Sequence, residues 1–278
     1  MSDVVLITGC SSGIGRAAAE GFVALGCTVY ATARRADALA TLGAQGCRTL
    51  ALDVTDEPSM ERAVRAIEAE HGAIDVLVNN AGYGQQGAIE QTSIERFRRQ
   101  FETNVFGAVR MCQLVLPAMR ERGRGRIVMV SSMGGRLTFP GGGAYHGSKY
   151  ALEAISDVLR FEVAKFGVHV VIVEPGLVAT KYGDAALSGL AGDEHAGAYA
   201  AFTTGVRGAL ENSFSGGVEG TSTAEEVAAT LIAAATDPAP SSRYVVGAMA
   251  AQLIALRQQF SDAEWDEMMT TMYVQPEP

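Results

Sequence analysis

The first 25 residues hold the pattern that most restricts the fold: an apolar run, a glycine-rich turn and a helical stretch, in that order. The apolar run Val4–Ile7 is typical of a parallel strand buried on both faces. Three glycines punctuate the turn Thr8–Gly15, and helical spacing continues from Arg16 to Leu25. Backbone N–H groups in such a turn can approach a pyrophosphate, and the dipole of the following helix favours its charge. The turn therefore indicates a dinucleotide site, with a purely structural glycine turn as the alternative.

Short apolar runs alternate with helical patterns along the rest of the chain. The further predicted strands are Thr28–Thr32, Arg48–Leu52, Ile74–Val78, Ile127–Val130, His169–Val173 and Arg243–Val246. Such alternation favours an α/β fold in which helices connect parallel strands. We predict one domain over residues 1–278, a Rossmann-type doubly wound parallel sheet with helices on both faces. Two small domains are the less economical alternative at this length.

The composition excludes several classes of protein. The formal net charge is −9 and no basic block stands out, so nucleic acid is not an expected partner. No apolar run approaches the ~18 residues of a membrane span, and Met1–Asp3 carries no basic targeting signal. The four cysteines and four histidines are scattered without metal-ligand spacing, which argues against a zinc site and a disulfide scaffold. We expect a cytoplasmic protein that holds no metal.

Polar residues follow the ends of three predicted strands. The second strand ends at Ala33–Arg35, where an acid would select NAD and an arginine accommodates the 2′-phosphate of NADP. These arginines favour NADP(H), the alternative being a solvated pair at a helix start. Asp53 ends the third strand, where it either hydrogen-bonds an adenine or caps the helix that begins near Pro58. Asn79–Gly82 ends the fourth strand and either admits a ligand or forms an ordinary turn.

The segment Ser131–Lys149 carries the clearest catalytic pattern. Tyr145 and Lys149 are four residues apart, so on a helix they share one face. An ammonium near a phenol lowers the pKa of the phenol below its free value of ~10, which suits general acid–base catalysis near neutral pH. Ser132 follows a predicted strand and can polarise a substrate oxygen. Taken alone, the Tyr–Lys pair could also be an ordinary pair on a helix surface.

Two capping boxes predict helix starts, one in each half of the chain. Thr92-x-x-Glu95 opens a helical region that runs to Met119, and Ser222-x-x-Glu225 opens a helix that ends near Thr236. Asn104 interrupts the first of these helices, where asparagine is a poor helix former. It is either simply tolerated there or marks a polar kink that points at the site.

Two segments near the C-terminus are predicted to border a substrate. Residues 181–220 are rich in small residues and poorly patterned, which favours a substrate lid over a linker. Residues 248–278 form a predicted helical tail. Its apolar face is expected to pack on the body or on a partner subunit, and comprises Leu253, Leu256, Phe260, Trp265, Met268, Met269 and Met272.

Over nearly its whole length the chain resembles the classical short-chain dehydrogenases/reductases. The resemblance is carried by Thr8-Gly9-x-x-x-Gly13-x-Gly15, Asn79-Asn80-Ala81-Gly82, Asn104, Ser132, Tyr145-x-x-x-Lys149 and Pro175-Gly176. It implies a catalytic tetrad of Asn104, Ser132, Tyr145 and Lys149. Tyr145 would transfer the proton, while Lys149 would bind the nicotinamide ribose and lower the pKa of the tyrosine. Ser132, thirteen residues before the tyrosine, would orient the substrate oxygen, and Asn104 would hold a water of the proton relay.

The resemblance also implies which residues contact the dinucleotide. The expected contacts are Gly9, Ser11, Ser12, Gly13, Ile14, Gly15, Arg34, Arg35, Asp53, Val54, Asn80, Ala81, Gly82, Tyr145, Lys149, Pro175, Gly176, Val178 and Thr180. Of these, Val178 and Thr180 would hold the carboxamide, and Asp53, Val54, Asn80 and Ala81 would line the adenosine side. Ala33-Arg34 resembles members that prefer NADP(H), although Ser12 stands where some of those members carry a basic residue.

The resemblance implies an NADP(H)-dependent carbonyl reductase or alcohol dehydrogenase that interconverts a ketone and a secondary alcohol. Within the family the chain is most similar to the 17β-hydroxysteroid and retinol dehydrogenase branch, which implies an apolar substrate of steroid-, retinoid- or polyketide-like character. A homodimer or homotetramer is implied as well. One alternative is a catalytically silent NADP(H)-binding sensor or scaffold of the same fold. Another is an epimerase or dehydratase of a longer branch, which has a different glycine spacing.

Overall fold

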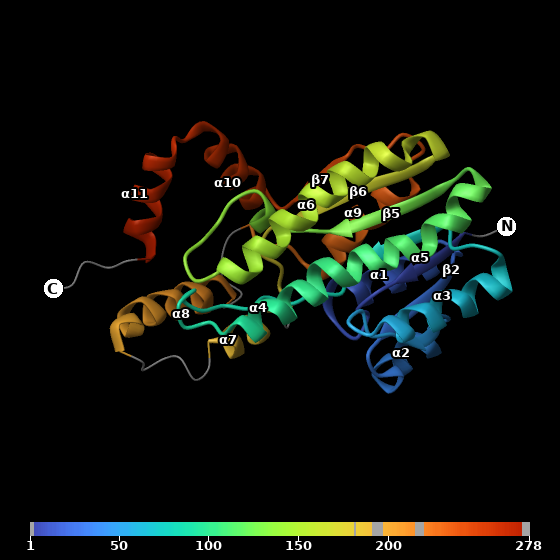
Figure 1. The fold of residues 1–278 in the computed structure, drawn as a ribbon, viewed down its shortest axis with the longest axis horizontal. Helices are drawn as coiled ribbons and strands as arrows, with labels where there is room; N and C mark the ends of the chain where they lie inside the picture. The colour runs from blue at the N-terminus through green and yellow to red at the C-terminus, as the bar shows by residue number, and fades with distance from the viewer. Residues whose placement is uncertain (1–2, 181, 191–196, 215–219, 274–278) are drawn as a thin grey trace.

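Across residues 3–180, 182–190, 197–214 and 220–273, which the computed structural model describes, the chain forms one parallel sheet of seven strands (Figure 1). The strands are β1 (Val4–Ile7), β2 (Thr28–Ala33), β3 (Arg48–Ala51), β4 (Val76–Asn79), β5 (Gly125–Val130), β6 (Val168–Pro175) and β7 (Arg243–Val246). All the predicted strands are present, with ends that differ from the predicted ends by a few residues. Their order in the sheet is β3-β2-β1-β4-β5-β6-β7, which confirms the doubly wound prediction.

The strand order reverses between β1 and β4. The chain builds outward from β1 through β2 to β3, then crosses back so that β4 pairs with the other edge of β1. In an open parallel sheet, ligands bind at the carboxyl ends of the strands that flank such a reversal. The fold therefore brings the glycine turn after β1 beside the segment Asn79–Gly82 at the end of β4.

Helices cover both faces of the sheet. They are α1 (Gly13–Ala24), α2 (Ala40–Ala44), α3 (Glu57–His71), α4 (Ile94–Phe101), α5 (Gly107–Arg122), α6 (Gly143–Val163), α7 (Tyr182–Gly189), α8 (Ala200–Phe214), α9 (Ala224–Thr236), α10 (Ala248–Gln259) and α11 (Asp262–Tyr273). Val5 and Ile7 face a core that includes α1 and α9, whereas Val4 and Leu6 face one that includes α3, α5 and part of α6. This alternation along β1 buries both faces of the strand, as its continuous apolar composition predicts. No helix in the described part of the chain combines the length and apolar character needed to span a membrane.

The capping box predicted at Thr92 is wrong by one residue. Ser93 is the N-cap of α4, and its side chain accepts a hydrogen bond from the N–H of Arg96 at 3.4 Å. The Thr92 hydroxyl instead donates to the carbonyl of Ala88 at 2.9 Å, because its backbone N–H also bonds that carbonyl and holds Thr92 in the preceding turn.

The second predicted capping box is displaced in the same direction. Thr223 caps α9 and forms a complete capping box with Glu226, in place of Ser222 and Glu225. Ser222 is extended and buried, since its backbone forms a parallel bridge with Val178. Because this bridge holds Ser222 away from the start of α9, Thr223 is the residue whose hydroxyl accepts a hydrogen bond from the helix, from the N–H of Glu226.

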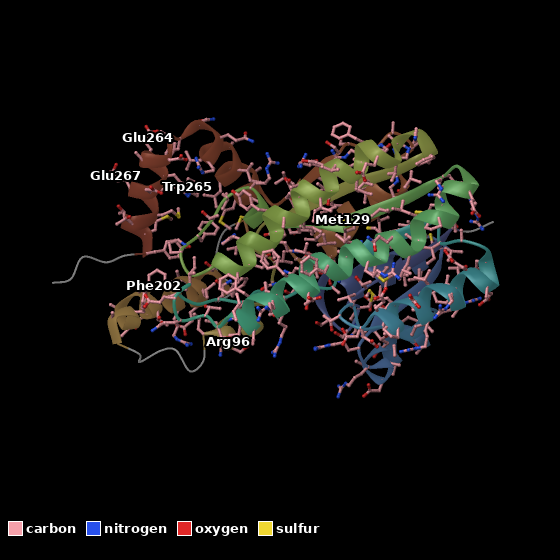
Figure 2. The ribbon with its side chains drawn as sticks, viewed as in Figure 1. Arg96, Met129, Phe202, Glu264, Trp265 and Glu267 are labelled. Carbon is pink, nitrogen blue, oxygen red and sulfur yellow. The ribbon has the colours of Figure 1, made fainter. Side chains whose placement is uncertain are left out.

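The tail comprises two helices, α10 and α11, which lie beyond one end of the sheet (Figure 1). Trp265 and Met269 of α11 are buried with Met133 and Leu137, which follow β5, in a third apolar cluster. Figure 2 shows Trp265 turned toward the body, whereas Glu264 and Glu267 point away from it. The tail thus packs on the body near the end of β5. Residues 181, 191–196 and 215–219 of the predicted lid lie outside the described residues, and its described parts include α7 and α8.

Candidate active site

The turn after β1 needs its glycines for two physical reasons. Gly9 and Gly13 have φ values of +77° and +58°, which disfavour other residues. A Cβ on Gly15 would lie 2.4 Å from the Asn80 amide nitrogen and 2.6 Å from the Gly9 carbonyl, so the chain cannot close there around a side chain. Ser12 is the N-cap of α1 and makes no capping hydrogen bond with its side chain. The first N–H groups of α1 therefore face the turn, as anion binding requires.

Thr8 and Asn80 join the ends of β1 and β4. The Thr8 hydroxyl accepts hydrogen bonds from the N–H groups of Asn80 and Ala81, each at 3.0 Å. The Asn80 amide donates to the carbonyls of Thr8 at 2.8 Å and Gly9 at 3.1 Å. Sequence reasoning placed Asn80 and Ala81 at the adenosine side but gave Thr8 no role. The first position of the glycine motif was the available signal for it.

The residues predicted to select the cofactor are solvent-accessible. Arg34 and Arg35 follow β2 and are exposed, and the Arg35 Nε lies 3.6 Å from the Asp37 carboxylate. Because those two side chains are 79% and 74% exposed, that ion pair is weak. Both guanidinium groups are thus accessible to a phosphate at the carboxyl end of β2.

Asp53 does not cap a helix. Its carboxylate accepts hydrogen bonds from the N–H of Thr55 at 2.9 Å and from the Thr55 hydroxyl at 2.8 Å. Asp56 is the N-cap of α3, so this alternative for Asp53 is wrong. Val54 is buried beside it, and a Cβ on Gly107 would lie 2.5 Å from the Val54 carbonyl. The adenine contact remains a prediction for both residues.

Asn104 lies in a π-helical turn, Glu102–Phe106, between α4 and α5, so the regular α-helix is interrupted at this residue, and the predicted kink toward the site stays a prediction. Its buried amide accepts a hydrogen bond from the N–H of Tyr83 at 3.2 Å and donates to the Tyr83 carbonyl at 3.0 Å. It also donates to the Ser148 hydroxyl on α6 at 3.2 Å. A π turn adds one residue to a helix and often occurs at functional sites. Here it lets one side chain join the segment after β4 to α6.

Ser132, Tyr145 and Lys149 are brought together at the end of β5. Ser132 is the second residue after the strand, and its hydroxyl accepts a hydrogen bond from the N–H of Gly134 at 3.0 Å. Tyr145 lies in the first turn of α6, with Lys149 one turn later. The Lys149 ammonium lies 5.9 Å from the centroid of the Tyr145 ring and donates to the Val130 carbonyl at 2.8 Å. These two residues therefore share one helix face, as predicted.

Burial tunes the charge of Lys149. The side chain is 7% exposed, and this desolvation lowers its pKa to about 8, although the carboxylate of Glu153 opposes the shift. Burial likewise raises the pKa of Glu153 to about 6, against the effect of Arg243. The cation beside the phenol is thus held with little water to screen its charge.

The segment after β6 reaches back to the glycine turn. Gly176 donates its N–H to the Val246 carbonyl at 2.9 Å, and Val178 forms the bridge with Ser222. A Cβ on Gly13 would lie 3.2 Å from the Thr180 side chain. Thr180 thus lies against the turn where a pyrophosphate is expected. Pro175 ends β6, so this predicted segment, like the glycine turn and Asn79–Gly82, lies at the carboxyl end of a strand.

His146 is a site residue that sequence reasoning missed. It lies next to Tyr145, is 6% exposed, and forms hydrogen bonds through both ring nitrogens to Gly134 and Phe139. In the sequence it counted only as one of four scattered histidines. Its position beside the predicted catalytic tyrosine was the signal that could have identified it.

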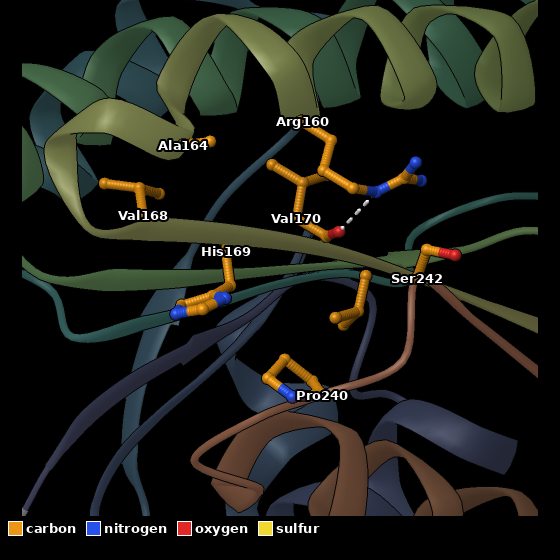
Figure 3. A pocket seen from close by; sticks show the side chains of 8 residues that line it. Arg160, Ala164, Val168, His169, Val170, Pro240 and Ser242 are labelled. Carbon is orange, nitrogen blue, oxygen red and sulfur yellow. Dashed lines mark hydrogen bonds between the residues drawn. The ribbon is translucent and has the colours of Figure 1, made fainter.

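A cavity of about 150 Å³ lies elsewhere, at the amino end of β6 (Figure 3). Its lining includes Val168, Pro240, Ser242 and Arg160, and the Arg160 guanidinium donates to the Val170 carbonyl at 3.0 Å. It lies at the opposite end of the strand from Pro175 and takes no part in the candidate active site. The described residues contain no group of His, Cys, Asp and Glu side chains suited to hold a metal ion.

Comparison with known proteins gives a family match. The family model described as short chain dehydrogenase matches residues 3–190. A 3-ketodihydrosphingosine reductase of Bacteroides thetaiotaomicron is 42% identical over 181 residues, which cover 65% of this chain and 66% of that protein. The crystal structure of a short-chain dehydrogenase from Streptomyces avermitilis is 36% identical, covers 97% of both chains and superposes with a TM-score of 0.82. A serine dehydrogenase in complex with NADP+ is 28% identical with a TM-score of 0.76, covering 88% of this chain and 95% of that one.

Proposed function

The chain belongs to the short-chain dehydrogenase/reductase family, and from that premise we propose that it interconverts a ketone and a secondary alcohol with NADP(H). The observation that carries the proposal is the position of Tyr145, buried Lys149 and Ser132 at the end of β5. A phenol, a nearby cation and a hydroxyl that donates a hydrogen bond are the groups that proton transfer to a carbonyl oxygen requires.

The glycine turn and its surroundings fit a nicotinamide dinucleotide. A Cβ on Gly9 would lie 2.8 Å from Ala81, so the turn leaves room for close approach only as glycine. The uncapped start of α1 provides N–H groups for a pyrophosphate. The proposed contacts are the glycine turn Gly9–Gly15, Arg34 and Arg35, Asp53 and Val54, Asn80–Gly82, Tyr145 and Lys149, and Pro175–Thr180. When bound, the nicotinamide supplies or accepts the hydride.

In reduction, Tyr145 donates its proton to the substrate oxygen, and in oxidation it accepts that proton. Ser132 stabilises the charge that develops on the same oxygen, and the Lys149 ammonium favours the phenolate that remains. Asn104 maintains the packing of the segment after β4 against α6 and is proposed to hold a water of the proton relay. Sequestering this exchange from bulk water is the proposed role of residues 181–220.

The preference for NADP(H) and for an apolar substrate rests on further observations. Arg34 and Arg35 are exposed at the end of β2, where a 2′-phosphate is expected. Apolar side chains of the third cluster, among them Met133, Phe139 and Leu177, lie near Ser132 and favour a fairly apolar substrate of steroid-, retinoid- or polyketide-like character. The Bacteroides relative, named as a 3-ketodihydrosphingosine reductase, supports a ketone as one substrate. Placement in the 17β-hydroxysteroid and retinol dehydrogenase branch is part of this proposal.

We further propose a cytoplasmic homodimer or homotetramer. The four cysteines are unpaired, in keeping with a reducing compartment. Tyr150, Val158 and Phe161 leave 43%, 57% and 80% of their area exposed along α6, a surface that a second copy could cover. Native mass spectrometry of the purified protein should give a mass of two or four chains, and a monomer at micromolar concentration would contradict this expectation.

The test of the function is NADPH oxidation by the purified protein over a panel of small and bulky ketones, with NADH in parallel. The wild-type protein should prefer NADPH, and Tyr145→Phe should lose at least ~100-fold in kcat because no proton donor remains. Retained NADPH binding in that variant would show that the loss is chemical. Tight NADPH binding by the wild-type protein without turnover of any ketone or alcohol would favour the silent sensor instead.

A further inference from the structure

His146 is held from two sides at the start of α6. One ring nitrogen, Nε2, lies 3.1 Å from the backbone nitrogen of Phe139, and the other, Nδ1, lies 2.9 Å from the carbonyl oxygen of Gly134. The side chain is 6% exposed, so these two partners replace water as its hydrogen-bond partners.

These partners determine the tautomer. A backbone N–H only donates, so Nε2 must accept the bond from Phe139. A carbonyl oxygen only accepts, so Nδ1 must carry the proton that is donated to Gly134. The imidazole is therefore neutral, and its burial lowers the pKa below the ordinary value, although the Gly134 bond opposes this effect. A protonated ring could not accept the bond from Phe139.

Gly134 connects this histidine to the catalytic groups. Its N–H donates to the Ser132 hydroxyl at 3.0 Å, while its carbonyl accepts from His146. A Cβ on Gly134 would lie 2.7 Å from the His146 Nδ1 and 3.3 Å from the Tyr145 ring. One residue is thus enclosed between the serine that would orient the substrate and the helix that carries the tyrosine.

The opposite side of His146 leads to the tail. The Phe139 ring lies 5.8 Å from the His146 ring and 6.1 Å from the ring of Tyr273 on α11, centroid to centroid. The Tyr145 and His146 rings are 5.6 Å apart. A continuous row of ring contacts therefore extends from Tyr145 through His146 and Phe139 to Tyr273 on α11. Within this row, His146 is the neighbour of Tyr145, and both of its ring nitrogens are hydrogen-bonded.

We propose that His146 is a positioning residue that sets the separation of Ser132 and Tyr145, by hydrogen-bonding the segment Gly134–Phe139 to the start of α6. The inference rests on the proposed reaction, because a carbonyl oxygen must meet both hydroxyl groups at once. A misplacement of about 1 Å between reacting groups can lower a rate roughly 100-fold.

Two variants separate hydrogen bonding from bulk. Glutamine provides a donor and an acceptor at a spacing similar to that of the two ring nitrogens, whereas leucine fills space without either. We expect His146→Leu to lower kcat for ketone reduction by about 10- to 100-fold, and His146→Gln to recover kcat to within about threefold of wild type. The Kd for NADPH should stay within about twofold in both, because the glycine turn lies after another strand.

Leu152→Ala is the control for general destabilisation. Leu152 lies on the same helix and is 2% exposed in the core beneath the sheet, away from Ser132. The Leu152→Ala substitution should lower Tm at least as much as His146→Leu does, while its kcat stays near the wild-type value. An unchanged kcat in His146→Leu, or an equal loss in His146→Leu and His146→Gln, would overturn the proposal.

Crystal structures of both variants make the inference independent of turnover. In His146→Leu the Ser132 hydroxyl should leave the Gly134 N–H and the segment Gly134–Phe139 should shift, and in His146→Gln neither should move. If the wild-type protein reduces no ketone and oxidises no alcohol, the proposed function fails, and these structures alone decide on His146. An unmoved Ser132 in the leucine variant would overturn the positioning role.

Discussion

Lys149 shows how a single residue is placed at the expense of stability. Its ammonium is buried on α6, where one carbonyl at the end of β5 accepts its hydrogen bond. The ordinary pKa of 10.5 falls to about 8 because the charged form has lost most of its water. A charge that destabilises the fold is also the charge that can stabilise a phenolate on Tyr145. Perturbed pKa values of this kind are common at functional sites.

The cost of burying Lys149 should appear as a pH dependence of stability. Between pH 8 and 10.5 the unfolded chain binds more protons at this lysine than the folded chain does, so stability rises with pH across that window. The fall in the pKa of Lys149 from 10.5 to about 8 corresponds to a destabilisation of roughly 3 kcal/mol. This destabilisation is present in full below pH 8 and is absent above pH 10.5. Denaturant unfolding of the wild-type protein and of Lys149→Met, without cofactor, should give a difference that follows this curve. A flat difference from pH 7 to 11 would show that burial does not set this pKa.

Arg34 should decide the choice of cofactor at the residue scale. An arginine–phosphate contact contributes about 1.5–3 kcal/mol, so Arg34→Ala should raise the KM for NADPH by roughly 10- to 100-fold. The KM for NADH should hardly change, since NADH lacks the 2′-phosphate. Arg62→Ala, an exposed arginine on α3, serves as the control for loss of surface charge. Equal losses with both cofactors in Arg34→Ala would remove the basis for the NADP(H) preference.

At the scale of elements, a buried ionic network joins α6 to the edge of the sheet. Glu174 of β6 is fully buried and pairs with Arg136 and Arg243, each at 3.1 Å. Arg243 of β7 also pairs with Glu153 and Asp157 of α6, at 3.1 Å and 2.6 Å. Arg243 thus pairs with three carboxylates, of which Glu174 has a second partner in Arg136 and Asp157 a second partner in Arg160 at 2.8 Å. The network adjoins Lys149 through Glu153.

Removal of Arg243 should therefore destabilise the protein strongly. Breaking a buried ion pair by deleting one partner costs about 3–5 kcal/mol, because the carboxylates of Glu153 and Glu174 would lose a partner cation while they stay buried. Arg243→Leu should show this loss in urea unfolding at pH 7. Arg62→Leu should cost under about 1 kcal/mol, because Arg62 and Asp56 are 66% and 51% exposed and 3.8 Å apart. Similar costs for the two variants would mean that water screens the network.

The same scale shows what the sequence could and could not predict. The strands were predictable because their apolar runs are buried on both faces, as Val4–Ile7 is. An interruption of the helix at Asn104 was suggested by the poor helix propensity of asparagine, whereas the π turn that forms it was not predicted. Both capping boxes were misplaced by one residue, because a serine or threonine one position earlier matched the pattern and only tertiary contacts, such as the bridge at Ser222, exclude it. The role of Gly134 and His146 depends on the path of the segment between them, which no local pattern encodes.

At the scale of the whole molecule, the buried apolar residues form three separate clusters, each of which stabilises a different part of the fold. Two lie on the faces of the sheet, and the third joins α10 and α11 to the residues that follow Ser132. Arg257 supports the corner between these helices, since its guanidinium lies 5.6 Å from the Trp265 ring and 2.6 Å from the Asp262 carboxylate. We therefore expect the tail to loosen before the sheet and the glycine turn do. Such a division suits an enzyme whose substrate site must open while its cofactor site stays formed.

Trp265→Ala tests whether the tail is a separate unit. Loss of a buried tryptophan costs about 3–5 kcal/mol, and here the cost should fall on the third cluster alone. Amide hydrogen exchange should accelerate in residues 248–273 while β4, β5 and β6 keep their protection, because the two sheet cores contain no residue of the tail. KM for bulky ketones should rise more than the Kd for NADPH, since most of the proposed cofactor contacts follow β1, β2, β3 and β4, and Gly176 and Leu177 are the ones that pack on the tail. Exchange that accelerated equally through the sheet would instead show one cooperative unit, in which the tail could not open without loss of the cofactor site.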